Sequence, residues 1–342
     1  MPARHPAIWF PAVRCGTGTD VFTETLVQGL QQRGIRAEIT WLPHRAEYLP
    51  WTVPVPKPPA WAHVVHINTW LHPRFIPRHL PVVATLHHSI HDPALKPYKG
   101  WLRAAYHRWW IAPVECRVLR RANRVVAVSR FVADMARQTL CDVPIQVIYN
   151  GIDTDLFKPG TDERSSGKPF RLLYVGAWKD LKGVDLLAPI MRELGAGFEL
   201  RYTGGQAVGK DRACMPANMH DLGRLPESGV LSAMQEADVL LFPSRSEGFG
   251  LVAAEALACG LPVIGITGTA VGEVVQQGVT GVLCGRDDVQ CLVAGVRSLA
   301  SARQQYSAMR LAARESALAR FSSTDMVDAH VRTYRALSGV EA

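Results

Sequence analysis

Residues 237–284 read ADVLLFPSRSEGFGLVAAEALACGLPVIGITGTAVGEVVQQGVTGVLC, a strand pattern, a glycine-rich turn and a helix pattern in succession. The apolar run at 239–242 predicts a buried parallel strand, and the run at 251–259 predicts a helix. Gly248 and Gly250 stand where the strand end meets the helix start. Such a corner presents unpaired backbone N–H groups and the positive end of a helix dipole. It therefore favours the binding of a phosphate or diphosphate group.

Two carboxylates flank these glycines. Glu247 precedes them, and Glu255 lies one to two turns into the predicted helix. A carboxylate can accept hydrogen bonds from two neighbouring hydroxyl groups. Two carboxylates beside a phosphate-binding corner therefore indicate a sugar-phosphate ligand. The same pattern would also arise from a solvent-exposed helix start that carries ordinary surface acids.

The whole phrase at 243–264, PSRSEGFGLVAAEALACGLPVI, resembles the retaining GT-B glycosyltransferases of glycosyltransferase family 4, the glycogen-synthase-like group. The resemblance implies that Glu247 contacts the donor sugar and that Glu255 holds the ribose of the nucleotide. It also implies that the turn between them lies against the sugar and the diphosphate, through Gly248, Phe249, Gly250 and Leu251.

The same resemblance implies the fold. We expect an α/β protein with the GT-B fold: two facing Rossmann-like domains, an interdomain cleft, and a C-terminal helix that crosses back. Residues 1–157 would form the acceptor-binding domain and residues 169–320 the nucleotide-sugar-binding domain. The polar stretch 158–168, KPGTDERSSGK, is the predicted linker. Residues 321–342 would form the helix that returns to the N-terminal domain.

Length and composition limit the class of protein to which the chain can belong. The chain has 342 residues, which suffices for two domains. Its seven cysteines contain no C-x-x-C pair, which argues against a disulfide framework or a zinc site and favours a reducing compartment. The N-terminus lacks a signal-peptide pattern, and no apolar run is long enough to span a membrane. We therefore expect a cytoplasmic protein, either free or peripheral on the inner face of the membrane.

The net charge of +8 implies an acidic partner. Basic residues gather at 96–130 among aromatic ones, a pattern that can seat a helix on an anionic membrane surface. A helix with a solvated basic face and tryptophans in the core would give the same pattern. No nucleic-acid-binding module accompanies the basic residues, so we expect no nucleic acid. The candidates for the membrane or acceptor surface are Trp101, Trp109, Trp110, Arg117 and Arg121.

A second glycine loop lies near the N-terminus. Gly16 and Gly18 separate the strand predicted at 8–13 from a helix that starts near Val21. The phrase GTGTDV is not G-x-G-x-x-G, so a dinucleotide site is unsupported. The resemblance implies that this loop lies near the donor phosphate and the acceptor. A tight turn without a ligand is the alternative.

Histidines follow the strand predicted at 82–86. The carboxyl ends of parallel strands are where ligands bind in such sheets. The resemblance implies that His87, with His88 as the alternate, meets the donor sugar; loop capping is the alternative role. Adjacent side chains on an extended chain point to opposite sides, so a metal shared by His87, His88 and His91 is not expected.

The strand predicted at 172–175 leads to Lys179 and Lys182, and a lysine here can neutralise a diphosphate leaving group. In the family pattern an arginine precedes the Lys-Gly pair, but this chain has Ala177. Lys179, Arg14 or Arg245 could replace it, or activity could be weakened. Further along, Leu225 matches, weakly, the strand end where the family binds the nucleobase.

The expected activity is transfer of a sugar, with retention, from a GDP- or UDP-sugar to a glycan or lipid-linked acceptor, as in cell-envelope polysaccharide or lipopolysaccharide synthesis. Lys182, Glu247 and His87 would serve catalysis, and no cofactor or metal would be required because no Asp-x-Asp motif stands at a strand end. A nucleotide-sugar 2-epimerase of the same fold and a catalytically weak nucleotide-sugar-binding relic are the alternatives.

Overall fold

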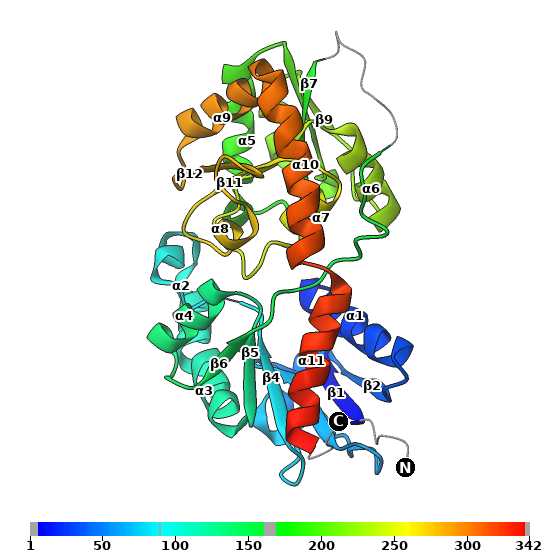
Figure 1. Cartoon of the computed structure of the whole chain (residues 1–342). Coiled ribbons are helices and arrows are strands. Elements are labelled where there is room, and N and C mark those ends of the chain that lie inside the picture. The colour runs from blue at the N-terminus through cyan, green and yellow to red at the C-terminus, as the bar shows by residue number, and fades with distance from the viewer. Residues whose placement is uncertain (1–5, 89, 161–168, 339–342) are drawn as a thin grey trace. The chain divides into compact units, whose positions relative to one another are not determined.

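The computed structural model describes residues 6–88, 90–160 and 169–338 (Figure 1). The chain divides into two compact units. The first unit ends at Gly151 and also contains the C-terminal segment from Ser323, and the second runs from Ile152 to Ser322. Of the predicted linker, residues 161–168 lie outside the described residues, and 158–160 belong to the second unit.

The first unit contains a six-stranded parallel sheet in the order β2-β1-β3-β4-β5-β6. Its inner strands β1, β3, β4 and β5 are short, mostly buried runs, as is typical of parallel sheets covered by helices, and the edge strands β2 and β6 are partly exposed. The strands are β1 (Ile8–Val13), β2 (Ala37–Leu42), β3 (Val64–Asn68), β4 (Val82–Leu86), β5 (Arg124–Ala127) and β6 (Ile145–Val147).

Helices cover this sheet (Figure 1). They are α1 (Gly18–Gln32), α2 (Trp101–Tyr106), α3 (Ala112–Arg121), α4 (Arg130–Thr139) and α11 (Ser323–Ser338). The π-helical turn η5 (His107–Ile111) joins α2 to α3, and the 3-10 turn η1 (His44–Ala46) follows β2. α11 packs against α1 at Gly29, where a Cβ atom would lie 2.5 Å from Cγ2 of Val327. Because of this close approach, α11 packs into the hydrophobic core of the first unit.

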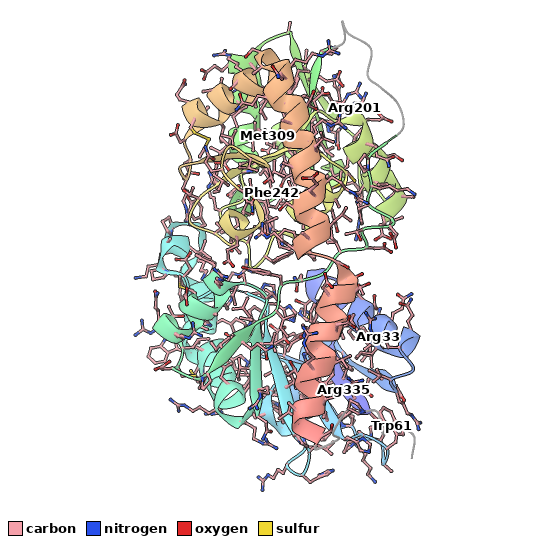
Figure 2. The ribbon with its side chains drawn as sticks, viewed as in Figure 1. Arg33, Trp61, Arg201, Phe242, Met309 and Arg335 are labelled. Carbon is pink, nitrogen blue, oxygen red and sulfur yellow. A yellow bond between two sulfur atoms is a disulfide. The ribbon has the colours of Figure 1, made fainter. Side chains whose placement is uncertain are left out.

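The second unit has its own six-stranded parallel sheet, in the order β12-β11-β10-β7-β8-β9. The strands are β7 (Phe170–Tyr174), β8 (Phe198–Tyr202), β9 (Met219–Asp221), β10 (Val239–Phe242), β11 (Val263–Ile266) and β12 (Gly281–Cys284). The helices are α5 (Val184–Leu194), α6 (Glu227–Glu236), α7 (Leu251–Ala258), α8 (Val271–Val274), α9 (Val289–Ser301) and α10 (Arg303–Arg320). Phe242, at the end of central β10, is only 4% exposed (Figure 2).

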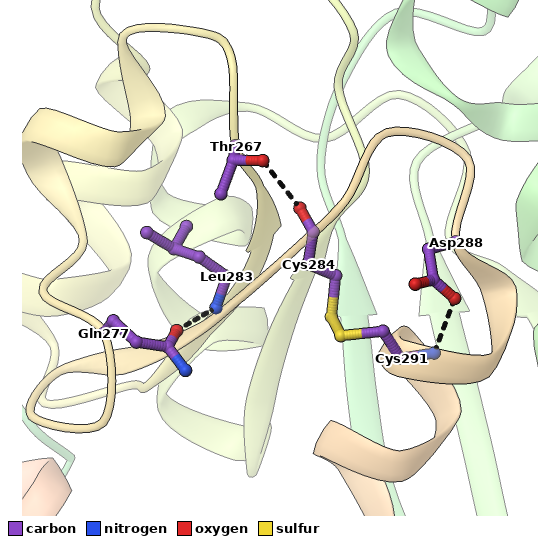
Figure 3. The surroundings of a disulfide bond; sticks show 6 residues. All are labelled: Thr267, Gln277, Leu283, Cys284, Asp288 and Cys291. Carbon is purple, nitrogen blue, oxygen red and sulfur yellow. Dashed lines mark hydrogen bonds between the residues drawn. A yellow bond between two sulfur atoms is a disulfide. The ribbon is translucent and has the colours of Figure 1, made fainter.

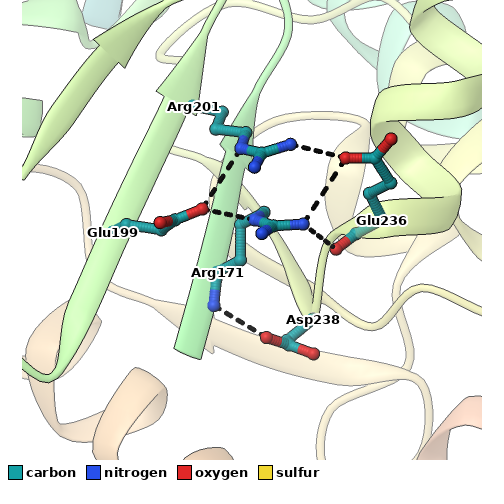
Figure 4. A network of polar contacts seen from close by, with 5 residues as sticks. All are labelled: Arg171, Glu199, Arg201, Glu236 and Asp238. Atoms are coloured by element: carbon teal, nitrogen blue, oxygen red, sulfur yellow. Dashed lines mark hydrogen bonds and ion pairs between the residues drawn. The ribbon is translucent and has the colours of Figure 1, made fainter. Parts of the chain in front are cut away.

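Charged side chains fasten β7, β8 and α6 at one edge of the second unit (Figure 4). Arg171 and Arg201 both bond Glu199, and both reach Glu236. The backbone N–H of Arg171 also donates to Asp238 Oδ2 at 2.7 Å. Burial raises the pKa of Glu199, but the two guanidinium groups outweigh it and hold the pKa below the ordinary value.

The structure corrects one sequence-based expectation about the C-terminal segment. Two helices, α9 and α10, precede the final helix and are divided at Ala302, which has a non-helical ψ of 71°. The final helix begins at Ser323 rather than at residue 321, because Phe321 closes α10. Among the described residues, no helix is both long and apolar enough to cross a membrane.

A disulfide joins Cys284, at the end of β12, to Cys291, in the first turn of α9 (Figure 3). The number and spacing of the cysteines argued against a disulfide framework, and they did not predict this bond. The Cα atoms are 5.6 Å apart because the loop between them folds α9 back onto the strand end. Asp288 stabilises this return by accepting a hydrogen bond from the N–H of Cys291 at 2.9 Å.

Candidate active site

Lys182 and Glu247 form an ion pair in the second unit. Nζ of Lys182 lies 2.6 Å from Oε1 of Glu247 and donates to the carbonyl of Ser246 at 3.3 Å. Lys182 ends the 3-10 turn η6 (Asp180–Lys182) after β7, and Glu247 follows β10. Because β7 and β10 are parallel neighbours, the loops after them leave the same edge of the sheet. The topology thus brings together two of the three groups that the sequence indicated for catalysis.

Gly183 fixes the position of Lys182. Its φ of +71° lies in the left-handed region, and a Cβ atom there would be 2.2 Å from the carbonyl oxygen of Pro243. Any other residue would therefore push the η6 turn away from the loop after β10. Gly183 of the Lys-Gly pair is therefore required by the fold, and Lys182 is the residue expected to take part in the chemistry.

The turn after Glu247 leads directly into α7. Gly250, with φ +98°, is the residue before the helix, and Leu251 is its first residue. Glycine supplies no side-chain cap, so the first N–H groups of α7 can serve a ligand. Phe249 is buried and packs edge-on against Phe321, with ring centroids 5.4 Å apart. This contact holds the turn, Gly248 included, in the second unit.

Glu255 lies one turn into α7. Burial, and secondarily the charge of Glu227 at the start of α6, raise its pKa to about 7. The carboxyl group is therefore close to half ionised at neutral pH. A half-buried acid at this place can accept a hydrogen bond from a hydroxyl group or donate one to it, whichever form is present.

Arg245 does not replace the arginine missing at Ala177. Its guanidinium is buried and binds Asp185 through two hydrogen bonds of 2.6 and 2.8 Å. Its Nε also donates to Asp287 at 2.6 Å. Because these carboxylates hold it, it is a structural residue. Lys179 is exposed at the start of η6 and stays a candidate.

Leu225 lies in the loop between β9 and α6, half-buried. Asp221, which no sequence pattern singled out, organises the same edge. Its carboxylate accepts hydrogen bonds from the N–H groups of Gly204, Gly205 and Gly223 and pairs with Arg212. A carboxylate that collects backbone N–H groups shapes the strand-end loops, and the paired glycines after β8 were its only signal in the sequence.

The glycine loop of the first unit is closed by its own aspartate. The Asp20 carboxylate accepts hydrogen bonds from the N–H groups of Cys15 at 3.0 Å and Gly16 at 2.7 Å. Gly18 is the first residue of α1. Arg14 lies over the ring of Trp41, with its Cζ 4.1 Å from the ring centroid. The Asp20 carboxylate thus accepts hydrogen bonds from two backbone N–H groups of the loop that the sequence pattern had suggested for a phosphate.

His87 follows β4 and is buried. Its Nε2 lies 2.8 Å from Oδ1 of Asn68, at the end of β3, and its ring packs edge-on against Phe22. Burial, ahead of the charges of neighbouring histidines, holds its pKa well below the ordinary value, so the imidazole is neutral at neutral pH. His91 pairs with Glu115 at 2.7 Å.

A buried polar cluster behind His87 was not predicted. His66, on β3, bonds the hydroxyl groups of Tyr334 at 2.5 Å and Thr85 at 2.7 Å. His330, on α11, stacks on His66 with ring centroids 5.6 Å apart. No local sequence pattern predicts this cluster, because β3 and α11 are separated by most of the chain.

The basic and aromatic segment divides into two parts. Trp101 and Trp109 are 78% and 73% exposed. Trp110 instead donates from Nε1 to the carbonyl of Glu47 at 3.0 Å, and Arg121 donates to the carbonyls of residues 77, 78 and 80. Arg117 is exposed on α3. Trp110 and Arg121 therefore serve the fold, and Trp101 and Trp109 stay candidates for a surface that meets a partner.

Comparisons with known proteins agree with this architecture. Residues 169–302 match the family model of glycosyl transferases group 1, and residues 59–156 match that of glycosyltransferase family 4. Glycogen synthase of Mycobacterium tuberculosis is 32% identical over 253 residues, which cover 69% of this chain and 59% of that protein. D-inositol 3-phosphate glycosyltransferase of Mycobacterium avium is 29% identical over 243 residues, 65% of this chain and 56% of that protein. The chain thus spans less than two thirds of either relative.

Two solved structures share the fold along nearly the whole chain. Sucrose-phosphate synthase of Thermosynechococcus elongatus superposes with a TM-score of 0.80 and 18% identity over 97% of this chain and 100% of that chain. HepE of Anabaena, in complex with UDP, superposes with a TM-score of 0.75 and 18% identity over the same shares. With its two parallel sheets and both family matches, the chain belongs to glycosyltransferase family 4 and has the GT-B fold.

Proposed function

We propose that the protein is a retaining glycosyltransferase that moves a sugar from a nucleoside-diphosphate donor to a glycan or lipid-linked acceptor. The observation that carries the proposal is the ion pair of Lys182 and Glu247 beside the glycine turn that starts α7. A cation, a helix start and two carboxylates are the groups needed to hold a diphosphate and the hydroxyl groups of its sugars.

The bond between the anomeric carbon and the diphosphate oxygen breaks, and negative charge develops on the diphosphate. Lys182 and the N–H groups that begin α7 are placed to stabilise that charge. The acceptor oxygen then bonds the anomeric carbon on the face that the diphosphate leaves, and the acceptor proton passes to the departing diphosphate oxygen. Glu247 holds the sugar and, through its ion pair, Lys182. Because these groups are cationic or dipolar, the mechanism requires no metal ion.

The donor is proposed to be a UDP-sugar first and a GDP-sugar second. One structural neighbour, HepE, was solved in complexes with UDP and with UDP-glucose. In this chain Glu255 would accept hydrogen bonds from the ribose, and Leu225 would lie by the base. Gly16, Gly18 and His87 are proposed to serve the donor or the acceptor from the first unit.

The acceptor is proposed to be a lipid-linked envelope glycan at an anionic membrane surface, with the protein peripheral on the inner face. Trp101 and Trp109 support this proposal, because large exposed aromatic side chains beside basic ones suit the membrane interface. Binding to phosphatidylglycerol vesicles should fall when both are replaced by alanine. Trp51, which is 61% exposed, offers the matched control variant. Equal binding of all three proteins would refute the proposal for the membrane.

The experiment that tests the function follows nucleotide release from UDP- and GDP-sugars, with and without acceptor glycans. We expect release that depends on one nucleotide and is lost in Lys182→Met. Conversion of the donor to its 2-epimer would instead support the epimerase. Binding of nucleotide without any cleavage of the donor would support a binding relic.

A further inference from the structure

The ends of β1 and β2 bring together a thiol, an imidazole and a carboxylate. Cys15 follows β1, while His44 and Glu47 lie in and directly after the turn η1 that follows β2. β1 and β2 are parallel neighbours, so the segments after them leave the sheet side by side. One ligand atom from each of these three side chains lies within 4.8 Å of the other two.

This spacing suits a metal ion. Residues three apart in a 3-10 turn are eclipsed, which places His44 and Glu47 on one side of η1. Nε2 of His44 lies 3.9 Å from Oε2 of Glu47. A zinc ion about 2.0–2.3 Å from its nitrogen, oxygen and sulfur ligands keeps those atoms roughly 3–4 Å apart. Only small side-chain movements would therefore close the three groups around an ion.

Two of the three groups are already held in place. The hydroxyl of Tyr106 donates to Oε1 of Glu47 at 3.3 Å, which leaves Oε2 toward His44. The indole of Trp110 donates to the backbone carbonyl of Glu47 at 3.0 Å. Asp20 holds the backbone N–H of Cys15 at 3.0 Å. Outer partners of this kind orient ligands and raise metal affinity.

We propose that Cys15, His44 and Glu47 bind a divalent transition-metal ion, with Zn²⁺ the best match. A thiolate and an imidazole favour such ions over Mg²⁺ and Ca²⁺. On binding, the thiol proton of Cys15 passes to solvent, and thiolate and carboxylate together balance the two charges of the ion. A fourth position stays open to water or to an added ligand. No C-x-x-C pair signals this site, because its ligands come from two strand ends.

The site lies in the first unit and uses none of the residues proposed for donor cleavage. Bound metal would tie the loop after β1 to the turn after β2, and so stabilise the glycine loop that contains Gly16. Failure of the metal proposal would therefore leave the proposed transfer reaction untouched, and inactivity toward donors would leave the metal site testable.

Cobalt(II) is the probe. Added to the chelator-treated 342-residue chain, Co²⁺ should produce a thiolate-to-cobalt charge-transfer absorption band that Zn²⁺ abolishes. Cys15→Ser should lose the band, and Cys214→Ser, which removes another exposed thiol, should keep it. His44→Ala and Glu47→Gln should each weaken Zn²⁺ affinity, and Tyr106→Phe should weaken it by about 10–100-fold. Melting curves in chelator establish that each variant is folded.

A second measurement needs no variant. Zn²⁺ should protect Cys15 from alkylation, read by mass spectrometry, while Cys214 in the same molecule continues to react. Absence of the charge-transfer band in the parent would overturn the proposal. So would a band that survives in Cys15→Ser, or equal alkylation of Cys15 with and without Zn²⁺.

Discussion

Oε1 of Glu247 lies 2.6 Å from Nζ of Lys182, although 65 residues separate them in the sequence. The carboxylate keeps the ammonium group at the carboxyl end of β7, beside the glycine turn of α7. The phenol of Tyr174 responds to the same carboxylate. Burial raises its pKa, and the negative charge of Glu247 raises it further. The pair acts as a unit, so either partner should be needed to keep the other in position.

Lys182→Met should therefore lower the rate of donor cleavage by about 10²–10³-fold, the usual loss when one group that stabilises developing charge is removed. Stability should change by about 1 kcal/mol or less, because both side chains are partly exposed. Steady-state kinetics and melting curves measure the two effects. Lys158→Met removes an exposed lysine of the same unit that is not proposed to contact the donor, and is the matched control. An equal loss in both variants would mean that the loss does not depend on the position of Lys182.

Gly183→Ala should destabilise the second unit strongly. The added Cβ would lie 2.2 Å from the Pro243 carbonyl oxygen, at a φ of +71° that alanine resists. We expect a loss of about 3 kcal/mol or more, from strain and clash together, measured by urea unfolding. Gly197→Ala is the control, because its Cβ would have nothing within 4 Å and its φ is not positive. Similar midpoints for the two variants would contradict this account.

Glu255 should make nucleotide binding depend on pH. Its pKa of about 7 means that the carboxylate form, which accepts hydrogen bonds from two ribose hydroxyl groups, grows as pH rises from 6 to 8. UDP affinity, measured by calorimetry, should rise over that interval in the parent and less in Glu255→Gln. Glu227→Gln removes the charge that helps to raise the pKa, so its binding curve should move to lower pH. Parallel curves for parent and Glu255→Gln would exclude Glu255 from the donor site.

Stability should change in the opposite direction. A folded-state pKa raised from 4.5 to about 7 favours the protonated form, so this contribution is complete below 4.5 and is lost as pH rises through 7. The full contribution of Glu255 to the free energy of unfolding is on the order of 3 kcal/mol. Relative to the parent, Glu255→Gln should therefore gain stability between these pH values, as urea unfolding at several pH values can measure.

The sequence was most informative where one segment contains the whole feature. The turn from Glu247 to Leu251 is such a case, because the strand end, the glycines and the helix start follow one another within a few residues. The apolar strands were equally clear, since burial on both faces leaves little choice of residue. The family phrase then supplied the expected roles of Glu247 and Glu255.

Features built from distant residues could not be predicted. The pairing of Arg245 with Asp185 and Asp287 depends on the first turn of α5 meeting the loops after β10 and β12, and it removed Arg245 from the candidate cations. The bond between His66 and Tyr334 joins residues 268 positions apart. The sequence carries no local mark of either contact, because each depends on the order of strands or on where α11 packs.

The histidine cluster of the first unit should make that unit sensitive to acid. Burial lowers the pKa of His330 to about 4 and holds that of His66 well below 6.5. A lowered folded-state pKa gives a contribution that is present above 6.5 and is lost as pH falls toward the folded value. Each such histidine should lower the free energy of unfolding by about 1.4 kcal/mol for every pH unit between 6.5 and its folded-state pKa. Stability of the first unit, followed by proteolysis or hydrogen exchange of α1 and α11, should therefore fall steeply below pH 6.5.

The structure also indicates how to weaken that dependence. His330 has one ring nitrogen bonded to the carbonyl of Met326 at 2.9 Å, and the other, Nε2, has no partner among the described residues. His330→Phe keeps an aromatic ring beside His66 and Phe22 and removes a group that must take up a proton on unfolding. Its stability should fall less steeply between pH 6.5 and 4 than that of the parent, whereas His79→Phe, at an exposed position, should match the parent. Identical slopes in all three proteins would place the acid sensitivity outside the cluster.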